Sequence, residues 1–161
     1  MTIQVGDTLP SINLTTMTSE GPKPVSLTEL SAGKKVVLFA VPGAFTPTCS
    51  VQHLPGFLEK NSDLKDKGAD IVACISVNDP FVMHEWGKQQ NVHEKILMLG
   101  DPFLTFTKSI GAEVDKSGRG LGIRSSRYTM LINDHKIMQI QEEKETGICE
   151  ISAAENFLNL I

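Results

Sequence analysis

A short loop-forming stretch between a predicted strand and a predicted helix constrains this chain most. The apolar run 36–41 predicts a buried strand, and residues 42–49 read PGAFTPTC. Two prolines and a glycine in that stretch end the strand and shape a loop. Residues 50–60 continue with helical spacing. We therefore expect Cys49 at the point where a strand ends and a helix begins.

Cys49 is the first candidate functional residue. Amide N–H groups at a helix N-terminus are unpaired and carry partial positive charge, which favours a thiolate and lowers its pKa. The hydroxyl of Thr46, three residues upstream, has a spacing that allows it to fold back on the sulfur. A cysteine that only fills a core needs neither feature, so we interpret Cys49 as a nucleophile.

A lowered thiol pKa alone does not make a fast catalyst. A free thiol with a pKa of about 8.5 is about 3% thiolate at pH 7, and a pKa of about 6 raises that fraction about 30-fold. Intrinsic nucleophilicity falls about tenfold over the same shift, so the net gain in rate is about threefold. The remaining acceleration must come from groups that hold the substrate and stabilise developing charge.

The motif and its neighbours resemble a known family. The spacing of Pro42, Thr46 and Cys49 matches the Pro-x-x-x-Thr-x-x-Cys signature of the peroxiredoxins. Three longer segments are similar to the type II, or peroxiredoxin-five-like (atypical two-cysteine), branch: residues 42–57, residues 76–83 with Trp86, and residues 120–128. These segments follow the family's order and together cover most of the chain.

The resemblance implies a thiol-dependent peroxidase. Cys49 would attack hydrogen peroxide or an alkyl hydroperoxide and become a sulfenic acid, which thioredoxin or glutathione/glutaredoxin then reduces through a disulfide. Thr46 would hydrogen-bond the sulfur and the peroxide, and Pro42 would shield the sulfur from water. Arg127 would supply a permanent cation and a planar fork of donors, with Arg124 as its competitor for that role.

The thiol that resolves the sulfenic acid stays open among three possibilities. Plant-like members of the branch carry a second cysteine at the position of Cys74, 25 residues after Cys49. Cys74 also reads as a core residue of the buried strand 70–77, and a disulfide needs α-carbons within about 7 Å. Animal-type members carry their resolving cysteine near Cys149, without a close local match. An external thiol is the third possibility.

The pattern along the chain predicts an α/β fold. Strand–helix–strand alternation, a hairpin turn and a closing helix predict a central mixed sheet flanked by helices. This is compatible with the thioredoxin-like fold of peroxiredoxins, with an N-terminal extension, as one domain over residues 1–161. The expected strands are 9–14, 36–41, 70–77, 96–99, 128–132 and 137–140, the hairpin turn is 133–136, and the expected helical segments are 25–30, 51–67, 80–90, 103–110 and 151–161.

Composition argues against several other classes. The net charge of −4 and the lack of a basic patch argue against nucleic acid or an anionic membrane as a partner. No apolar run approaches the length of a membrane span, and residues 1–7 lack a secretory signal, so we expect a cytoplasmic protein. The odd cysteine count without Cys-x-x-Cys argues against a disulfide framework. The His-Glu pairs at 84–85 and 93–94 lack a third ligand, so we expect no metal and no cofactor.

Two further expectations concern assembly and a rival function. The resemblance implies a homodimer. The rival hypothesis is a non-enzymatic peroxide sensor or redox-relay protein on the same fold, in which Cys49 oxidises and signals to a partner without turnover. His53 shares the helix face of Cys49, and we expect it to be a structural or dimer-rim residue, because peroxiredoxin chemistry needs no histidine base.

Overall fold

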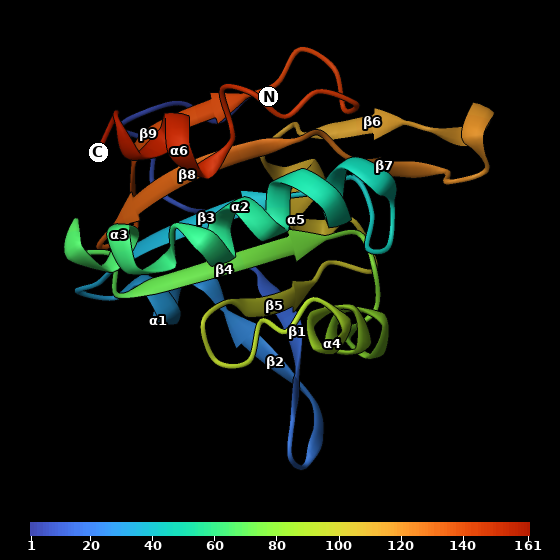
Figure 1. Ribbon diagram of the computed structural model, residues 1–161, viewed down its shortest axis with the longest axis horizontal. Helices are drawn as coiled ribbons and strands as arrows, with labels where there is room; N and C mark the ends of the chain where they lie inside the picture. Colours follow the sequence, from blue (N-terminus) through green and yellow to red (C-terminus); the bar gives the residue numbers. More distant parts are fainter.

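The structure, a computed structural model that describes residues 1–161, contains one seven-stranded sheet and one separate two-stranded sheet (Figure 1). The strands are β1 (Asn13–Thr18), β2 (Gly21–Ser26), β3 (Lys35–Ala40), β4 (Ile71–Ser76), β5 (Leu97–Gly100), β6 (Glu113–Asp115), β7 (Ile123–Ser125), β8 (Tyr128–Asn133) and β9 (Lys136–Glu142). The helical elements are α1 (Leu27–Ser31), the π-helical turn η1 (Cys49–His53), α2 (Leu54–Glu59), α3 (Asn61–Asp66), α4 (Pro80–Gln89), α5 (Thr105–Ser109), the 3₁₀ turn η2 (Ser117–Arg119) and α6 (Ala154–Leu158).

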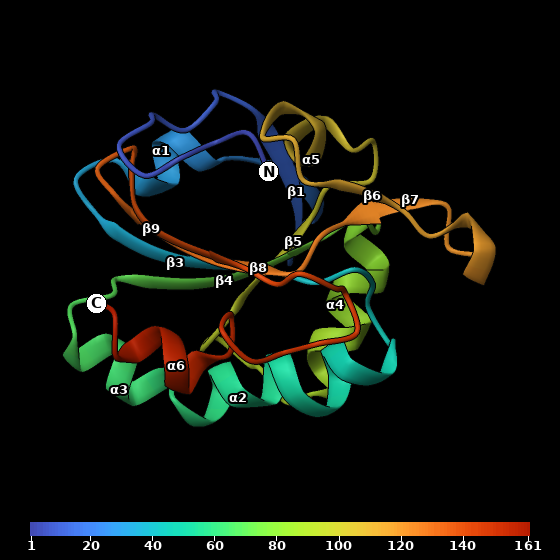
Figure 2. The same cartoon turned by 90° about the horizontal axis from the view of Figure 1, so that it is seen from above.

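The large sheet has the order β2-β1-β5-β4-β3-β8-β9 and is mixed, as the sequence predicted. Strands β3, β4 and β5 run parallel, while β8 pairs antiparallel with both β3 and β9. Strands β6 and β7 form an arm with η2 at its tip, and this arm projects away from the main sheet (Figure 2). None of the helices is long and apolar enough to cross a membrane.

The central strands explain why helices cover both faces of the sheet. Side chains alternate along a strand, so in β3 Val37 and Phe39 enter one core while Leu38 and Ala40 enter the other. Because both faces of such a strand are buried, its sequence is a continuous run of apolar residues. Helices α2, α3, α4 and α6 cover the first face, and α1 and α5 cover the second (Figure 2). This is the flanked mixed sheet expected of a thioredoxin-like fold.

Local signals in the sequence determine where several elements begin. The Ser26 hydroxyl accepts the amide proton of Glu29 at 3.2 Å and starts α1. The Asp79 carboxylate accepts that of Val82 at 2.9 Å and starts α4, with Pro80 as its first residue. The hairpin turn at 133–136 places two residues at positive φ, 45° and 71°, as two-residue hairpin turns require.

Several predicted boundaries were wrong. The first strand begins at Asn13 rather than at residue 9, and the helix predicted at 51–67 is divided into η1, α2 and α3. The closing helix begins at Ala154 instead of residue 151. Strands β2, β6 and β7 were not predicted, because β2 contains two prolines and the arm strands have three residues each.

Candidate functional site

Cys49 is the first residue of η1, at the end of the loop that follows β3. Its side chain is fully buried. The widened π turn, in which the amide of Leu54 donates to the carbonyl of Cys49, has a local reason. Pro55 has no N–H to donate to the carbonyl of Val51, so a regular α-helical hydrogen bond cannot form there. Pro55 therefore explains why the chain widens into a π turn after Cys49.

The loop before Cys49 is fixed by contacts with β4 and α4. The Ala44 amide donates to Asn78 Oδ1 at 3.0 Å, which ties the loop to the end of β4. The Trp86 indole donates to Ser50 Oγ at 3.1 Å, which ties η1 to α4. Phe45 takes a φ of 64°, a conformation that is strained for a side chain with a Cβ. Strain of this kind persists only where neighbouring contacts hold the backbone.

Thr46 is half-buried and Pro42 is buried in this loop. The Thr46 hydroxyl donates to the carbonyl of Gly43 at 2.7 Å, so its single proton is not directed to the Cys49 sulfur, although the resemblance implied a hydrogen bond there. Its lone pairs remain free to accept a hydrogen bond from a substrate O–H. Pro42 is buried, and both residues line a cavity.

Arg127 directly precedes β8, the strand that pairs with β3, and its side chain contacts Cys49. Its Nη2 donates to Cys49 Sγ at 3.3 Å and to the carbonyl of Thr146 at 2.9 Å, and its Nε donates to the same carbonyl at 3.2 Å. The guanidinium is 1% exposed and forms no ion pair with a carboxylate. A buried cation usually has an anionic partner. Among its contacts, only the Cys49 sulfur is a group that ionises to an anion.

Arg124, the competing arginine, is directed elsewhere. Its Nε donates to the carbonyl of Leu121 at 2.8 Å, and its Nη1 donates to the carbonyl of Val77 at 3.2 Å. Its Nη1 also lies 3.5 Å from the carbonyl of Pro42. Arg124 therefore supports the backbone beside Pro42, while Arg127 is the arginine in contact with the sulfur.

His53 completes the contacts of Arg127. Arg127 Nη1 lies 3.0 Å from His53 Nδ1, and because a guanidinium only donates, that nitrogen must be the acceptor. The other ring nitrogen, Nε2, lies 3.2 Å from the carbonyl of Ser152, to which its N–H donates. Burial, followed by the charge of Arg127, lowers the pKa of His53 to about 3. His53 is therefore a neutral acceptor that holds Arg127.

Residues 143–152 form a loop that the sequence connected with the site only through Cys149, a candidate resolving thiol, and not through any contact with Arg127. The Glu143 carboxylate accepts from the amides of Glu150 at 2.6 Å and Ser152 at 2.9 Å and from the Ser152 hydroxyl at 2.8 Å. The same loop presents the Thr146 carbonyl to Arg127. Thr48 also contacts it, through a long hydrogen bond of 3.4 Å to the carbonyl of Gly147. The loop holds Arg127 through the main-chain carbonyl of Thr146, a group that has no sequence signature.

The other two cysteines lie in different environments. Cys74 is fully buried on β4, in the same apolar core as Cys49, and burial raises the pKa of its thiol. Cys149 lies half-buried in the 143–152 loop, where burial also raises the pKa of its thiol. All three cysteines are free thiols.

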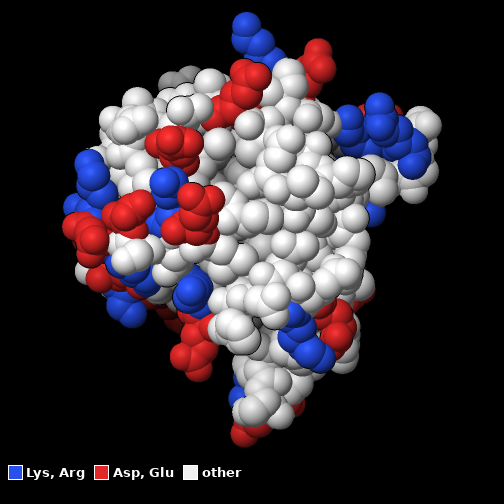
Figure 3. Space-filling model, in the orientation of Figure 1, with Lys and Arg blue, Asp and Glu red and all other residues white.

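A cavity of about 670 Å³ leads to the site. Its floor includes Arg127, and its sides come from the loop before Cys49, from the β6–β7 arm and from the 143–152 loop. Its charged rim residues are Asp115, Lys116, Arg119, Lys144 and Glu145. Lysine and arginine side chains gather on the arm in the space-filling view (Figure 3).

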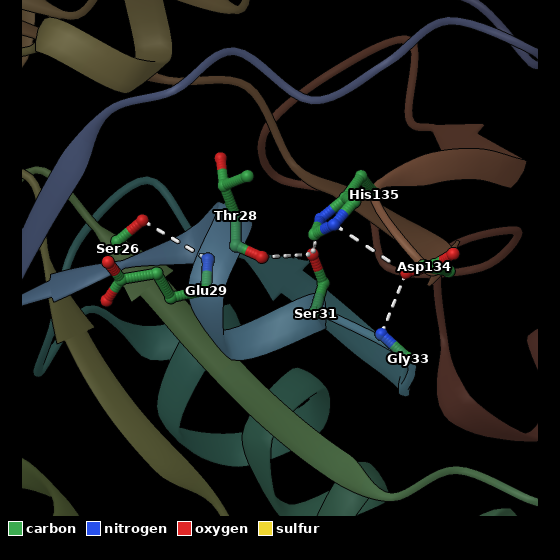
Figure 4. A network of polar contacts seen from close by, with 7 residues as sticks. All are labelled: Ser26, Thr28, Glu29, Ser31, Gly33, Asp134 and His135. Carbon is green, nitrogen blue, oxygen red and sulfur yellow. Dashed lines mark hydrogen bonds and ion pairs between the residues drawn. The ribbon is translucent and has the colours of Figure 1, made fainter.

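A second polar cluster has the composition of a hydrolase triad but not its geometry (Figure 4). Ser31 Oγ lies 3.2 Å from His135 Nδ1, and Asp134 Oδ1 lies 3.6 Å from His135 Nε2. Ser31 is 1% exposed, and Asp134 Oδ1 accepts the amide of Gly33 at 2.8 Å. A nucleophile must be accessible to substrate, and its base must be oriented by a hydrogen bond. This cluster meets neither condition and instead connects the β8–β9 turn to the end of α1 and to Gly33.

Comparisons with known proteins show the family of this chain. The family model described as Redoxin matches residues 4–158. Peroxiredoxin-2C of Oryza sativa subsp. japonica is 46% identical over 160 residues, which cover 99% of this chain and 98% of that protein. Peroxiredoxin-2E, chloroplastic, of Arabidopsis thaliana is 43% identical over 163 residues, which cover 99% of this chain and 69% of that protein.

Solved structures of peroxiredoxins have the same fold as this chain. Reduced Prx3 in complex with hydrogen peroxide, from Vibrio vulnificus, has a TM-score of 0.93 and 49% identity, with 98% of each chain covered. Peroxiredoxin 5 from Alvinella pompejana has a TM-score of 0.84 and 36% identity, with 98% of this chain and 96% of that chain covered. The chain therefore belongs to the Redoxin family and is a peroxiredoxin of the type II, peroxiredoxin-five-like branch.

Proposed function

We propose that this thiol-dependent peroxidase reduces hydrogen peroxide and alkyl hydroperoxides through Cys49. The Cys49 thiolate attacks the terminal oxygen of the peroxide, so that an S–O bond forms as the O–O bond breaks. The leaving alkoxide or hydroxide takes up a proton and departs as alcohol or water, and Cys49 becomes a sulfenic acid. The observation that carries the proposal is the 3.3 Å contact between Arg127 Nη2 and Cys49 Sγ.

Arg127, Thr46 and Pro42 have distinct roles in this proposal. Arg127 stabilises the negative charge on sulfur and on the departing oxygen, because its own charge is not neutralised by a carboxylate. Thr46 accepts a hydrogen bond from the peroxide, since its own proton is engaged by Gly43. Pro42, buried beside the cavity, excludes water from the sulfur.

The test is the second-order rate constant for oxidation of the reduced protein by hydrogen peroxide and by tert-butyl hydroperoxide at pH 7. We expect a value within about 10⁴–10⁸ M⁻¹s⁻¹, the usual range for enzymes, that disappears in Cys49→Ser. Cys74→Ser is the matched control, because it removes a thiol from the same core and should retain the rate. Peroxide consumption by Cys49→Ser at the wild-type rate would overturn the proposal.

We propose that an external thiol, supplied by thioredoxin or by glutathione/glutaredoxin, resolves the sulfenic acid. Cys74 is held inside a central strand that pairs with both β3 and β5, so moving it would disrupt the sheet. Cys149 lies in an irregular loop and is the internal thiol that needs the smaller rearrangement. The double variant Cys74→Ser/Cys149→Ser should then retain multiple turnovers with an external thiol. Loss of turnover in only one of the single variants would identify that cysteine as the resolving residue instead.

We also propose that the protein is a homodimer. An uncharged face covers the region of η1 and the preceding loop (Figure 3). Three large apolar side chains of η1, this loop and the neighbouring α4 are exposed: Phe45, Val51 and Phe81. Sedimentation velocity should detect a dimer that Val51→Asp and Phe81→Asp dissociate. The control Met138→Asp changes an exposed apolar residue on β9 and should remain dimeric. A monomeric wild-type protein would refute this part.

For its compartment, we propose the cytoplasm, because three free thiols suit a reducing environment. Two of the similar relatives carry the word chloroplastic in their names. Cell fractionation with an antibody against the protein distinguishes the two compartments. Recovery with an organelle fraction would contradict the proposal.

A further inference from the structure

Asn78, which follows β4, contacts the loop before Cys49 from outside the proposed site. Its Oδ1 accepts the amide proton of Ala44 at 3.0 Å and the hydroxyl proton of Ser76 at 2.7 Å. A backbone N–H can only donate, so the atom that faces Ala44 must be the side-chain oxygen. Both lone pairs of that oxygen are therefore engaged, and one of them holds the backbone of the loop.

The position of Asn78 is itself fixed by the sheet. Ser76 is the last residue of β4, is 1% exposed and pairs with Gly100 of β5. A Cβ at Gly100 would lie 2.6 Å from the carbonyl oxygen of Asn78, so only glycine allows β5 to approach the backbone this closely. The carbonyl of Val77 accepts from Arg124 Nη1 at 3.2 Å. The oxygen that Asn78 presents to the loop is therefore held by its neighbours.

The hydrogen bond at Ala44 also sets the direction of the Gly43 carbonyl. The Gly43 C=O and the Ala44 N–H belong to one planar trans peptide unit, and they point in opposite directions. Because the N–H is directed to Asn78, the C=O is directed to the other side of the loop. There it accepts the Thr46 hydroxyl at 2.7 Å and the Thr46 amide at 3.4 Å. The orientation of this one peptide unit therefore decides where the Thr46 proton goes.

Two features of the turn 43–46 indicate that this orientation needs support. A Cβ on Gly43 would lie 3.1 Å from Thr46 Cγ2 and 3.2 Å from Arg124 Nη1, so the crowded position is occupied by the residue type whose backbone rotates most freely. Phe45 takes a strained φ of 64°. A turn without external contacts would relax by rotating its peptide units, and the hydrogen bond to Asn78 opposes that rotation.

We infer that Asn78 is a positioning residue that keeps the Thr46 hydroxyl an acceptor for the peroxide. The inference rests on the proposed function, in which Thr46 accepts the O–H of the peroxide. While Asn78 holds the peptide unit, the Thr46 proton stays on the Gly43 carbonyl, and the lone pairs of the hydroxyl remain for the substrate. Without Asn78 the unit can rotate, the proton is released, and the hydroxyl no longer presents lone pairs alone.

The test is the rate constant for oxidation of Cys49 by hydrogen peroxide in a cycle of variants at Asn78 and Thr46. Cys74→Ser/Cys149→Ser is the parent protein, in which Cys49 is the only thiol. Asn78→Ala should slow oxidation about 10–100-fold when Thr46 is present. In Thr46→Val, which lacks the hydroxyl and is itself slower, Asn78→Ala should change the rate by less than about twofold. In Thr46→Ser, which keeps a hydroxyl, the slowing should persist.

Two variants and a second reagent separate this role from a general loosening of the loop. Asn78→Asp keeps an oxygen that can accept from both Ala44 and Ser76, so it should recover most of the rate at 1 M salt, where the added charge is largely screened. Methyl methanethiosulfonate has no O–H, so it should react with Cys49 at the parent rate in Asn78→Ala. A loosened loop would expose the sulfur and speed that reaction. Asn159→Ala removes an exposed side chain after α6 and should match the parent in both reactions.

The outcomes distinguish this inference from the proposed function. Failure of hydrogen peroxide to oxidise Cys49 in the parent protein would overturn both. Normal oxidation of the parent, together with an unchanged rate in Asn78→Ala, would overturn the role of Asn78 alone. The same conclusion would follow if Asn78→Ala slowed Thr46→Val as much as it slowed the parent, if Asn78→Asp recovered none of the rate, or if methyl methanethiosulfonate reacted faster with Asn78→Ala.

Discussion

At the scale of single residues, the site depends on an arginine whose charge is left unneutralised. Arg127 is surrounded by a carbonyl, a neutral imidazole and a sulfur, and burial removes it from the screening of water. A carboxylate in place of His53 would hold the guanidinium equally well, but it would cancel the charge. The neutral acceptor therefore fixes the direction of the donors and preserves the full attraction for an anionic sulfur.

Arg127→Lys tests whether the planar fork matters as well as the charge. A lysine keeps the cation but cannot donate to Thr146 and Cys49 in the same fixed geometry. We expect the rate constant for oxidation by hydrogen peroxide to fall about 10²–10³-fold, as it does when one preorganised donor is removed from an active site. Stopped-flow fluorescence of Trp86, the only tryptophan, provides the measurement. A rate within threefold of wild type would contradict the role of the fork.

His53→Leu and His53→Gln test the neutral acceptor. Leucine leaves Arg127 Nη1 buried without its partner, so the guanidinium should lose its alignment and peroxide oxidation should slow about 100-fold. The glutamine amide oxygen can accept the same hydrogen bond, so His53→Gln should recover most of the rate. A purely structural role predicts that loss of rate tracks loss of thermal stability in both variants. Equal rates in the two variants would therefore count against the positioning role.

Local spacing identified the candidate residues within one loop, whereas Arg127 was identified only through the resemblance and its contacts with His53 and Thr146 were not predicted. Cys49, Thr46 and Pro42 stand within one loop, where a strand end and a helix start can be read directly. Arg127 and His53 are 74 residues apart in the chain, and no local pattern pairs them. Thr146 acts through its carbonyl, a group that every residue possesses. Only the folded chain identifies that contact.

At the scale of elements, the 143–152 loop is a support for Arg127 that is itself held by one carboxylate. Glu143 follows β9 and collects three donors from the far end of the loop, so both ends of the loop meet at one point. Its own amide donates to the carbonyl of Arg127 at 2.9 Å. The position of Thr146 therefore depends on Glu143, although the two carboxylate oxygens never touch the site.

Glu143→Ala should loosen this loop without removing any contact to Arg127 directly. The three donors lose their acceptor, at a cost of about 1–3 kcal/mol for each group that stays buried. Hydrogen exchange by mass spectrometry should speed up across residues 144–152, and oxidation of Cys49 should slow with it. Glu150→Ala removes an exposed side chain from the same loop and keeps the amide that Glu143 binds, so it should resemble wild type. Unchanged exchange in Glu143→Ala would refute the support.

Element boundaries were predictable where the chain's own chemistry sets them. Ser26 and Asp79 cap helices that the sequence located, and the turn at 133–136 places Asp134 and His135, two residue types that tolerate positive φ better than most, at its centre. The division of the long helix after Cys49 arises from Pro55 and from packing of α2 and α3 against one core, which a periodic apolar pattern does not separate. Strand β2 exists because β1 offers it a full set of partners, despite a poor intrinsic preference.

At the scale of the whole molecule, His53 links the site to acid stability. Its pKa of about 3 lies below the ordinary value of 6.5, so between these pH values the unfolded chain binds a proton that the folded chain does not. Stability therefore rises with pH in that window and is lost on acidification. The stability of wild type relative to His53→Gln should fall by about 1.4 kcal/mol per pH unit between pH 6 and pH 4.

Urea unfolding at several pH values checks this slope. His84→Gln is the matched control, because it removes a histidine that is exposed on α4. If wild type and His53→Gln show parallel stability curves from pH 7 to pH 4, His53 does not titrate as its burial requires.

The two edges of the large sheet have a consequence for how copies of this protein can meet. Pro22 and Pro24 of β2 have no amide proton. In an antiparallel pair, every second residue of β2 donates its amide proton to β1, so these prolines occupy the other positions, whose backbone groups face away from β1. At the opposite edge, the N-terminal segment pairs with the start of β9 through Gly6, Asp7 and Leu9. Neither edge offers a continuous row of donors to an incoming strand. The prolines at one edge and the covering segment at the start of the other both hinder the sheet from growing from one molecule into the next, which favours copies that stay separate when they are crowded.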